Sequence, residues 1–231
     1  MKFTLFCFLI VFSSSLSAQF AVVDDSDGFV YVRSGAGKNF PVIDSLKNRD
    51  VVYQYEGESS WVNIDYQLSA DRAKSFKSGY VHSSRIKLVQ TFTEIPRNQI
   101  NDTLIKFKWD SCQLIINEQY FNPKKHRFTY HKYEDQDSVI SKIDGRDIWG
   151  TDGDLPQTQY GKCQLKLGKK VIDLPSASLF NPNLHLTSLF IDRFTNTLYL
   201  SAFNSDGAGG YVVLWEIRNG TFYQQFIAYG F

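Results

Sequence analysis

The sequence predicts an all-β protein, with a small N-terminal barrel followed by a second antiparallel β-rich domain. Aromatic residues favour strands, and 19 Phe and 13 Tyr stand beside a single Met among the 231 residues. Short apolar or alternating segments recur along the chain, and clusters of Gly, Ser, Asn and Asp divide them. The one modest helix that we expect covers residues 176–180, before Asn181-Pro182.

The balance of basic and acidic residues indicates which class of partner to expect. Lys and Arg number 25 against 24 Asp and Glu, which gives a formal net charge of +1. Nucleic-acid binding rests on clustered positive charge. We therefore expect no nucleic-acid partner.

The first 18 residues have the features of a secretory signal peptide. Lys2 precedes an unbroken apolar run from Phe3 to Phe12, which is too short to span about 30 Å of hydrocarbon. Small residues lead to Ala18, after which a signal peptidase would cleave. The alternative is a buried strand at the start of the domain. We expect a protein that begins at Gln19 and is secreted or periplasmic, at most peripheral to a membrane.

Cleavage would remove Cys7 and leave Cys112 and Cys163. An oxidising compartment allows these two cysteines to form a disulfide. The alternative is a pair of small buried thiols. The sequence contains no Cys-x-x-Cys motif and no Cys/His cluster, so we expect no metal and no cofactor.

Short strands predict a small barrel before residue 90. We expect them at residues 29–33, 40–43, 51–55, 61–66, 79–81 and 86–89. In the first strand, Phe29-Val30-Tyr31-Val32-Arg33 alternates between apolar and more polar positions, and a Gly/Ser loop follows it. We expect Arg33 to end this strand and to pair with a local acid.

A family resemblance covers residues 22–89. The string Val-Tyr-Val-Arg-Ser-Gly-Ala-Gly-Lys-Asn-Phe-Pro-Val-Ile at residues 30–43 resembles the opening of the bacterial SH3-type domain. That family typically reads Leu-Asn-Val-Arg, then Ser/Gly/Pro residues, an aromatic residue and a Val-Ile pair. The match continues through residues 46–50, 61–64 and 79–86. Three departures from the pattern are Val30-Tyr31 for Leu-Asn, Asn48-Arg49 for a glycine turn, and Tyr80 where tryptophan is common.

The resemblance implies a secreted, non-catalytic protein of the bacterial cell envelope whose residues 19–89 bind peptidoglycan or a peptide. Aromatic side chains supply contact area at low entropic cost. The candidate ligand contacts are Tyr31, Tyr55, Trp61, Tyr66 and Tyr80. The alternative is that Trp61 and Tyr80 form the core of so small a barrel.

Residues 90–103 are expected to link the two domains, because they are polar and Pro96 interrupts strand pairing. Residues 104–231 return to strand patterns. The clearest part is a meander with strands at residues 197–203, 211–217 and 221–228. Asn219-Gly220 between the last two strands is a strong hairpin signal.

The sequence does not predict an enzyme. Cys112 and Cys163 stand in strand-like surroundings, whereas a nucleophilic cysteine needs an activating histidine and a helix N-terminus. Neither a Gly-x-Ser-x-Gly motif nor a His-Glu-x-x-His motif is present.

A second functional hypothesis comes from the loop at residues 206–211. Its sequence is Asp206, Gly207, Ala208, Gly209, Gly210 and Tyr211. It resembles the protruding loop of periplasmic lysozyme inhibitors, with Asp206 where that family has serine. The resemblance implies an inhibitor or immunity protein that blocks a cell-wall hydrolase. The alternative is an ordinary hairpin whose glycines adopt positive φ and whose tyrosine packs in the sheet.

Overall fold

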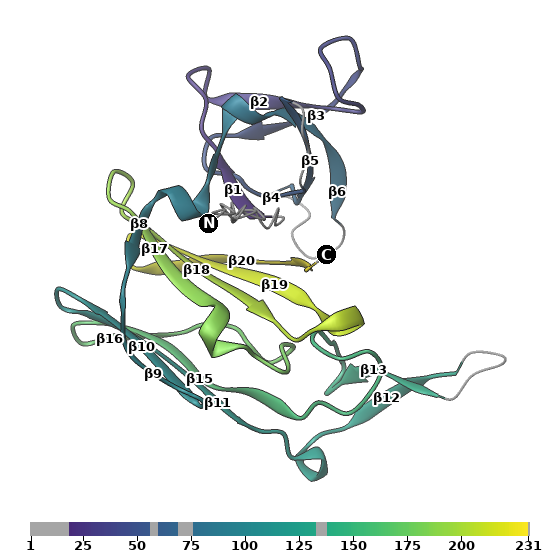
Figure 1. Ribbon diagram of the computed structural model, residues 1–231, viewed down its shortest axis with the longest axis vertical. Coiled ribbons are helices and arrows are strands. Elements are labelled where there is room, and N and C mark those ends of the chain that lie inside the picture. The colour runs from purple at the N-terminus through teal and green to yellow at the C-terminus, as the bar shows by residue number, and fades with distance from the viewer. Residues whose placement is uncertain (1–18, 56–59, 69–75, 133–137, 231) are drawn as a thin grey trace, which may run out of the picture.

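The computed structural model describes residues 19–55, 60–68, 76–132 and 138–230, which form four antiparallel sheets (Figure 1). The helices in this part of the chain are 3-10 turns of three residues, so the all-β prediction is confirmed. None of the described helices is long and apolar enough to cross a membrane. The predicted signal peptide, residues 1–18, lies outside the described residues.

The N-terminal sheet has the strand order β3-β2-β6-β5-β4-β1-β7 and curls into a barrel (Figure 1). Its strands are β1 (Gln19–Val23), β2 (Phe29–Arg33), β3 (Val42–Lys47), β4 (Val51–Gln54), β5 (Trp61–Tyr66), β6 (Lys77–His82) and β7 (Ile86–Leu88). Small β-branched residues fill the barrel: Val32, Val52, Ile64 and Val81 are all 0% exposed. A narrow barrel leaves room for side chains alone in its interior.

Strand β1 is the barrel strand that the sequence patterns missed. After Gln19, its residues Phe20-Ala21-Val22-Val23 form a continuous apolar run, since the strand is buried on both faces. Ala21 and Val23 point into the barrel, whereas Phe20 and Val22 point away from it into a second core.

Two five-stranded sheets form the C-terminal part. The central sheet has the order β20-β19-β18-β17-β8 and the outer sheet the order β16-β15-β11-β10-β9. The central strands are β8 (Thr93–Ile95), β17 (Thr187–Asp192), β18 (Thr197–Asn204), β19 (Tyr211–Arg218) and β20 (Thr221–Tyr229). The outer strands are β9 (Arg97–Asn101), β10 (Leu104–Trp109), β11 (Cys112–Tyr120), β15 (Thr158–Leu167) and β16 (Lys170–Asp173). Phe107 and Leu114 of the outer sheet share a core with Leu200 and Trp215 of the central sheet.

The barrel covers the other face of the central sheet (Figure 1). Phe20 and Tyr53 of the barrel share one core cluster with Tyr199, Leu214 and Phe226 of the central sheet. The central sheet is therefore buried on both sides, which explains why the first seven residues of β19 are all buried. We call this contact the barrel–sheet core.

Polar contacts flank the barrel–sheet core. Arg49 adopts a left-handed conformation with φ 73°, where the SH3-type pattern has a glycine turn. Its Nη2 donates to Thr197 Oγ1 at 2.9 Å, and its carbonyl accepts from Arg218 Nη2 at 2.9 Å. Arg218 also pairs with the buried carboxylate of Glu216 at 2.5 Å. These contacts hold Arg49 in a conformation that is uncommon outside glycine.

The segment 90–103, expected as a link, contributes strands to both C-terminal sheets. β8 pairs with β17 in the central sheet, and β9 pairs with β10 in the outer sheet. Pro96 lies between the two strands and so interrupts neither. The chain thus leaves the barrel and enters the sandwich without a free linker.

The helix predicted at residues 176–180 is wrong. Leu179 and Phe180 instead form isolated β-bridges with Trp149 and Gln159. A small hairpin sheet packs on Phe180, with strands β12 (Phe128–His131), β13 (Val139–Ile143) and β14 (Arg146–Asp147). The meander and its Asn219-Gly220 turn are confirmed: both turn residues have positive φ, at 48° and 66°.

Replacing Leu214 with Ala should destabilise the barrel and the sandwich together. Leu214 is 0% exposed in the barrel–sheet core, and a buried Leu→Ala change costs about 2–5 kcal/mol. Urea unfolding followed by circular dichroism should show one transition at a lower midpoint. Phe194→Ala serves as the control because Phe194 is 98% exposed. Two separate transitions in the wild-type chain would contradict the shared core.

Candidate functional site

The outer face of β2 forms one wall of a pocket on the barrel. Alternation along β2 buries Val30 and Val32 and turns Phe29, Tyr31 and Arg33 outward. The Phe29 and Tyr31 rings contact each other edge to face, with centroids 5.1 Å apart. Both rings remain partly exposed, Tyr31 at 50%.

The opposite wall comes from β5 and β6, where Trp61 and His82 are register partners. Their ring centroids lie 5.5 Å apart at an interplanar angle of 89°. Arg33 Cζ lies 5.9 Å from the centre of the Trp61 ring, within the range of a cation–π contact. Lys38 also lines the cavity, which measures about 230 Å³. We call this cavity the barrel pocket.

Positive charge exceeds negative charge in the described lining of the barrel pocket, which holds Arg33, Lys38 and Arg85 but a single carboxylate, that of Asp27. Arg33 donates from Nη1 to the carbonyl of Phe40 at 2.7 Å, and neither Arg33 nor Lys38 has an acidic partner among the described residues. The expectation that Arg33 pairs with a local acid is therefore wrong. Arg85 on the rim differs, because Asp25 and Asp27 lie 2.7 and 3.3 Å from its Nη1.

His82 offers a further hydrogen-bond donor to the barrel pocket. Its Nδ1 accepts from the backbone N–H of Ser84 at 3.4 Å and lies 2.8 Å from the Ser84 hydroxyl. When Nδ1 accepts in this way, the neutral ring carries its proton on Nε2. The pocket thus combines aromatic faces with N–H donors on Arg33, Lys38 and His82.

The five aromatic residues predicted to contact a ligand divide into four groups. Tyr31 and Trp61 line the barrel pocket. Tyr66 is 1% exposed in the barrel core, where its hydroxyl donates to Asp44 Oδ2 at 3.2 Å. Tyr55 lies at the barrel–sheet core, and its hydroxyl donates to Asp65 Oδ2 at 2.7 Å. Tyr80 is half-buried opposite Arg33, outside the set of residues that lines the pocket.

Sequence reasoning missed most of the residues that line the barrel pocket, among them Phe29, Lys38 and His82. Phe29 could have been found from the alternation of β2, because it shares the outward face with Tyr31. Lys38 and His82 required the fold, since they come from a loop and from a strand distant in the sequence. Neither Trp61 nor Tyr80 belongs to the buried core, as each remains half-buried.

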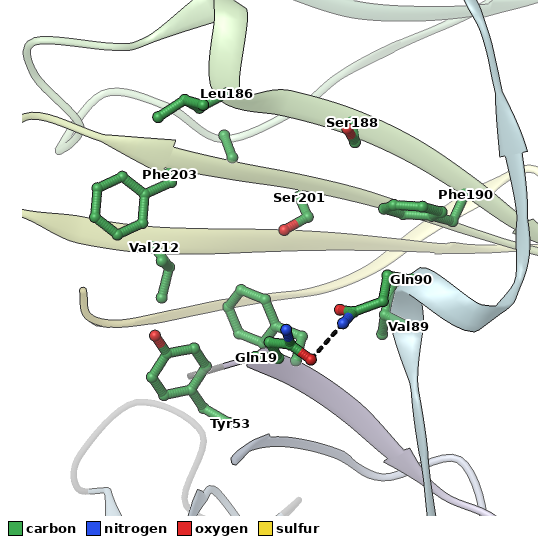
Figure 2. A pocket seen from close by; sticks show the side chains of 12 residues that line it. Gln19, Tyr53, Val89, Gln90, Leu186, Ser188, Phe190, Ser201, Phe203 and Val212 are labelled. Carbon is green, nitrogen blue, oxygen red and sulfur yellow. Dashed lines mark hydrogen bonds between the residues drawn. The ribbon is translucent and has the colours of Figure 1, made fainter. Parts of the chain in front are cut away.

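A second hollow of about 420 Å³ lies between the barrel and the central sheet (Figure 2). Phe20 and Tyr53 form its barrel side, while Ser188, Ser201 and Phe203 form its floor on the sheet. At one end the Gln90 side-chain amide donates from Nε2 to the side-chain oxygen Oε1 of Gln19. No charged residue belongs to the described lining. We call this hollow the cleft.

The loop at residues 206–211 does not protrude in the manner of an inhibitory hairpin. Tyr211 is 0% exposed, and its hydroxyl donates to the carbonyl of Phe180 at 3.0 Å. Gly207–Gly209 forms a 3-10 turn that begins at a positive φ of 51°. A Cβ on Gly209 would lie 3.3 Å from the backbone of Gly150. The alternative of an ordinary hairpin with a packed tyrosine fits this geometry.

Asp206 is exposed, as are Gly207 and Ala208 of the same loop. It lies on the rim of a polar groove that also contains Asp102, Glu118 and His185. His185 Nε2 is 4.0 Å from Asp102 Oδ1, and both side chains are open to solvent. Among the described residues, no group of three His, Cys, Asp or Glu side chains is placed to hold a metal ion.

Cys112 and Cys163 are free thiols. They lie on neighbouring strands, but Cys112 pairs with Leu167 and Cys163 pairs with Ile116. This register separates them by about 13 Å along the strands, beyond the 4.4–6.8 Å Cα separation typical of a disulfide. The disulfide hypothesis is therefore wrong, and the alternative of two thiols holds. Burial and the nearby Asp173 carboxylate raise the pKa of Cys163.

Comparison of the chain with protein-family models, with curated proteins and with solved structures finds no match.

Thiol titration tests the cysteine assignment. The chain beginning at Gln19, denatured without reductant, should react at both cysteines. In the native state Cys163 should be protected, since it is 4% exposed and its raised pKa keeps it protonated. The Cys112→Ser variant supplies the reference for one thiol. Thiols that appear only after reduction would show that a disulfide forms after all.

Proposed function

We propose that the protein is a secreted, non-catalytic component of the bacterial cell envelope that binds peptidoglycan or a peptide through the barrel pocket. One observation carries the proposal: Arg33 and Lys38 have no acidic partner among the described residues, and they stand beside the exposed ring of Tyr31 and the half-buried ring of Trp61. A carboxylate on the ligand would pair with the positive charges of Arg33 and Lys38, and the aromatic rings would contact the apolar part of the ligand.

The size of the barrel pocket favours a long ligand that inserts one group. Its volume of about 230 Å³ lies below the ~300–1,000 Å³ typical of sites that enclose a whole small molecule. Peptidoglycan stem peptides carry free carboxylates on a chain long enough to extend across the barrel surface. We expect weak, salt-dependent binding, because exposed charges are screened over about 8–10 Å at physiological ionic strength.

The secreted location and the cell-wall role in this proposal rest on the sequence. The apolar run that ends before Ala18 supports export. The resemblance of residues 22–89 to the bacterial SH3-type domain supports a binding role at the cell wall. The inhibitor hypothesis has no comparable support, because the tyrosine that would enter a hydrolase cleft is buried.

Sedimentation with purified sacculi tests the proposal. The experiment uses the whole chain from Gln19, since the barrel shares a core with the sheet. The wild-type protein should pellet with sacculi, and Lys38→Gln should weaken binding about threefold to tenfold, as expected for loss of one charge-assisted contact.

Lys108→Gln is the matched control. It removes one exposed charge from β10, away from the barrel, and should leave sedimentation unchanged. If the wild-type protein remains in the supernatant, the proposal fails. If Lys38→Gln pellets as well as the wild type, the barrel pocket is not the binding site.

A further inference from the structure

The cleft lies where the central sheet extends beyond the barrel. Tyr199, Leu214 and Phe226 belong to the barrel–sheet core. Farther along the same face, Ser188 and Ser201 are direct register partners across β17 and β18. They replace the apolar side chains of the covered half and form a polar patch on the cleft floor (Figure 2).

The cleft contains hydroxyl groups with unused hydrogen-bonding capacity. The hydroxyls of Tyr53, Ser188 and Ser201 have no hydrogen-bond partner in the part of the chain that the structure describes. Tyr53 is 1% exposed, yet its hydroxyl points into the cleft (Figure 2). Burial, with a contribution from Asp65, raises the pKa of Tyr53 to about 12. The hydroxyl is therefore neutral and can both donate and accept.

The remaining lining of the cleft indicates which class of ligand it can bind. It holds no charged group in its described part, so an ion would lose its hydration without compensation. The ring of Phe203 and the exposed side chain of Leu186 provide apolar contact beside the hydroxyls. The Gln19 and Gln90 side chains add amide donors and acceptors beyond the bond that they share.

Two other occupants fit this lining less well. An acyl chain would bury the hydroxyls of Tyr53, Ser188 and Ser201 without partners, which is unfavourable. An extended peptide that adds to a sheet requires a free strand edge. The cleft floor is instead the face of a sheet, and β17, β18 and β19 already pair with neighbours there.

We propose that the cleft binds an uncharged saccharide, with a sugar ring against Phe203 and sugar hydroxyls bonded to Tyr53, Ser188 and Ser201. A sugar presents hydroxyls that both donate and accept, as these side chains require, together with apolar C–H faces. The volume of about 420 Å³ falls within the ~300–1,000 Å³ range of small-molecule sites. The site is separate from the barrel pocket, with which it shares no lining residue.

Binding to defined oligosaccharides tests the inference. The whole chain from Gln19 is applied to immobilised neutral oligosaccharides of glucose, galactose, mannose and N-acetylglucosamine, and to their uronic-acid counterparts. Binding should be confined to neutral members. Calorimetry with the strongest of these should give an affinity that Tyr53→Phe and Ser201→Ala each lower about threefold to tenfold, as for one lost hydrogen bond.

Both variants should fold normally, because the deleted hydroxyls have no described partner, and unchanged melting temperatures would verify this. Ser45→Ala on the exposed part of β3 is the matched control and should bind as the wild type does. If none of the neutral oligosaccharides binds, the inference is overturned, whether or not 1-decanol, a probe for an acyl chain, binds instead. Equal affinity of the wild type and both cleft variants would overturn it too.

Discussion

The packing of Phe20 and Tyr53 against Leu214 and Phe226 is the contact on which the rest of the architecture depends. It turns two β-rich parts into one body, because the apolar outer face of β1 and β4 has no other cover in the described structure. The same contact buries the central sheet on its second face. β19 can therefore be apolar along nearly its whole length without exposing that surface to water.

This contact also determines which barrel surfaces remain open. β1 and β4 are covered by the sheet, whereas β2, β5 and β6 provide the lining of the barrel pocket. The cleft forms at the edge of the covered area, where serines replace apolar residues on the sheet. The positively charged pocket and the uncharged cleft are therefore held in a fixed relation by one hydrophobic contact.

Alternation of apolar and polar residues was sufficient to predict a strand that has one solvent-exposed face. It predicted β2 correctly, and the same alternation implies that Phe29 and Tyr31 point outward. It failed for β1, which is buried on both faces and so shows a continuous apolar run. The type of an aromatic residue did not determine its role either: Tyr31 is exposed, while Tyr66 is in the core.

Long-range pairing accounts for the other differences. The even number of cysteines suggested a disulfide, but the register of β11 and β15 keeps the two thiols apart. The glycine-rich loop resembled an inhibitory hairpin, but Tyr211 is held by Phe180, a residue distant in the sequence. The cleft had no local sequence signal, because its residues come from segments distant in the sequence, among them β1, β4, β17, β18 and β19, and meet only after the barrel docks.

Native-state hydrogen exchange tests the shared core most directly. If the barrel and the sheet are one cooperative unit, the slowest amides of β4 and β19 should exchange through openings of the same free energy, with the same dependence on denaturant. A barrel whose slowest amides exchange through a smaller opening, while β19 remains protected, would contradict this account.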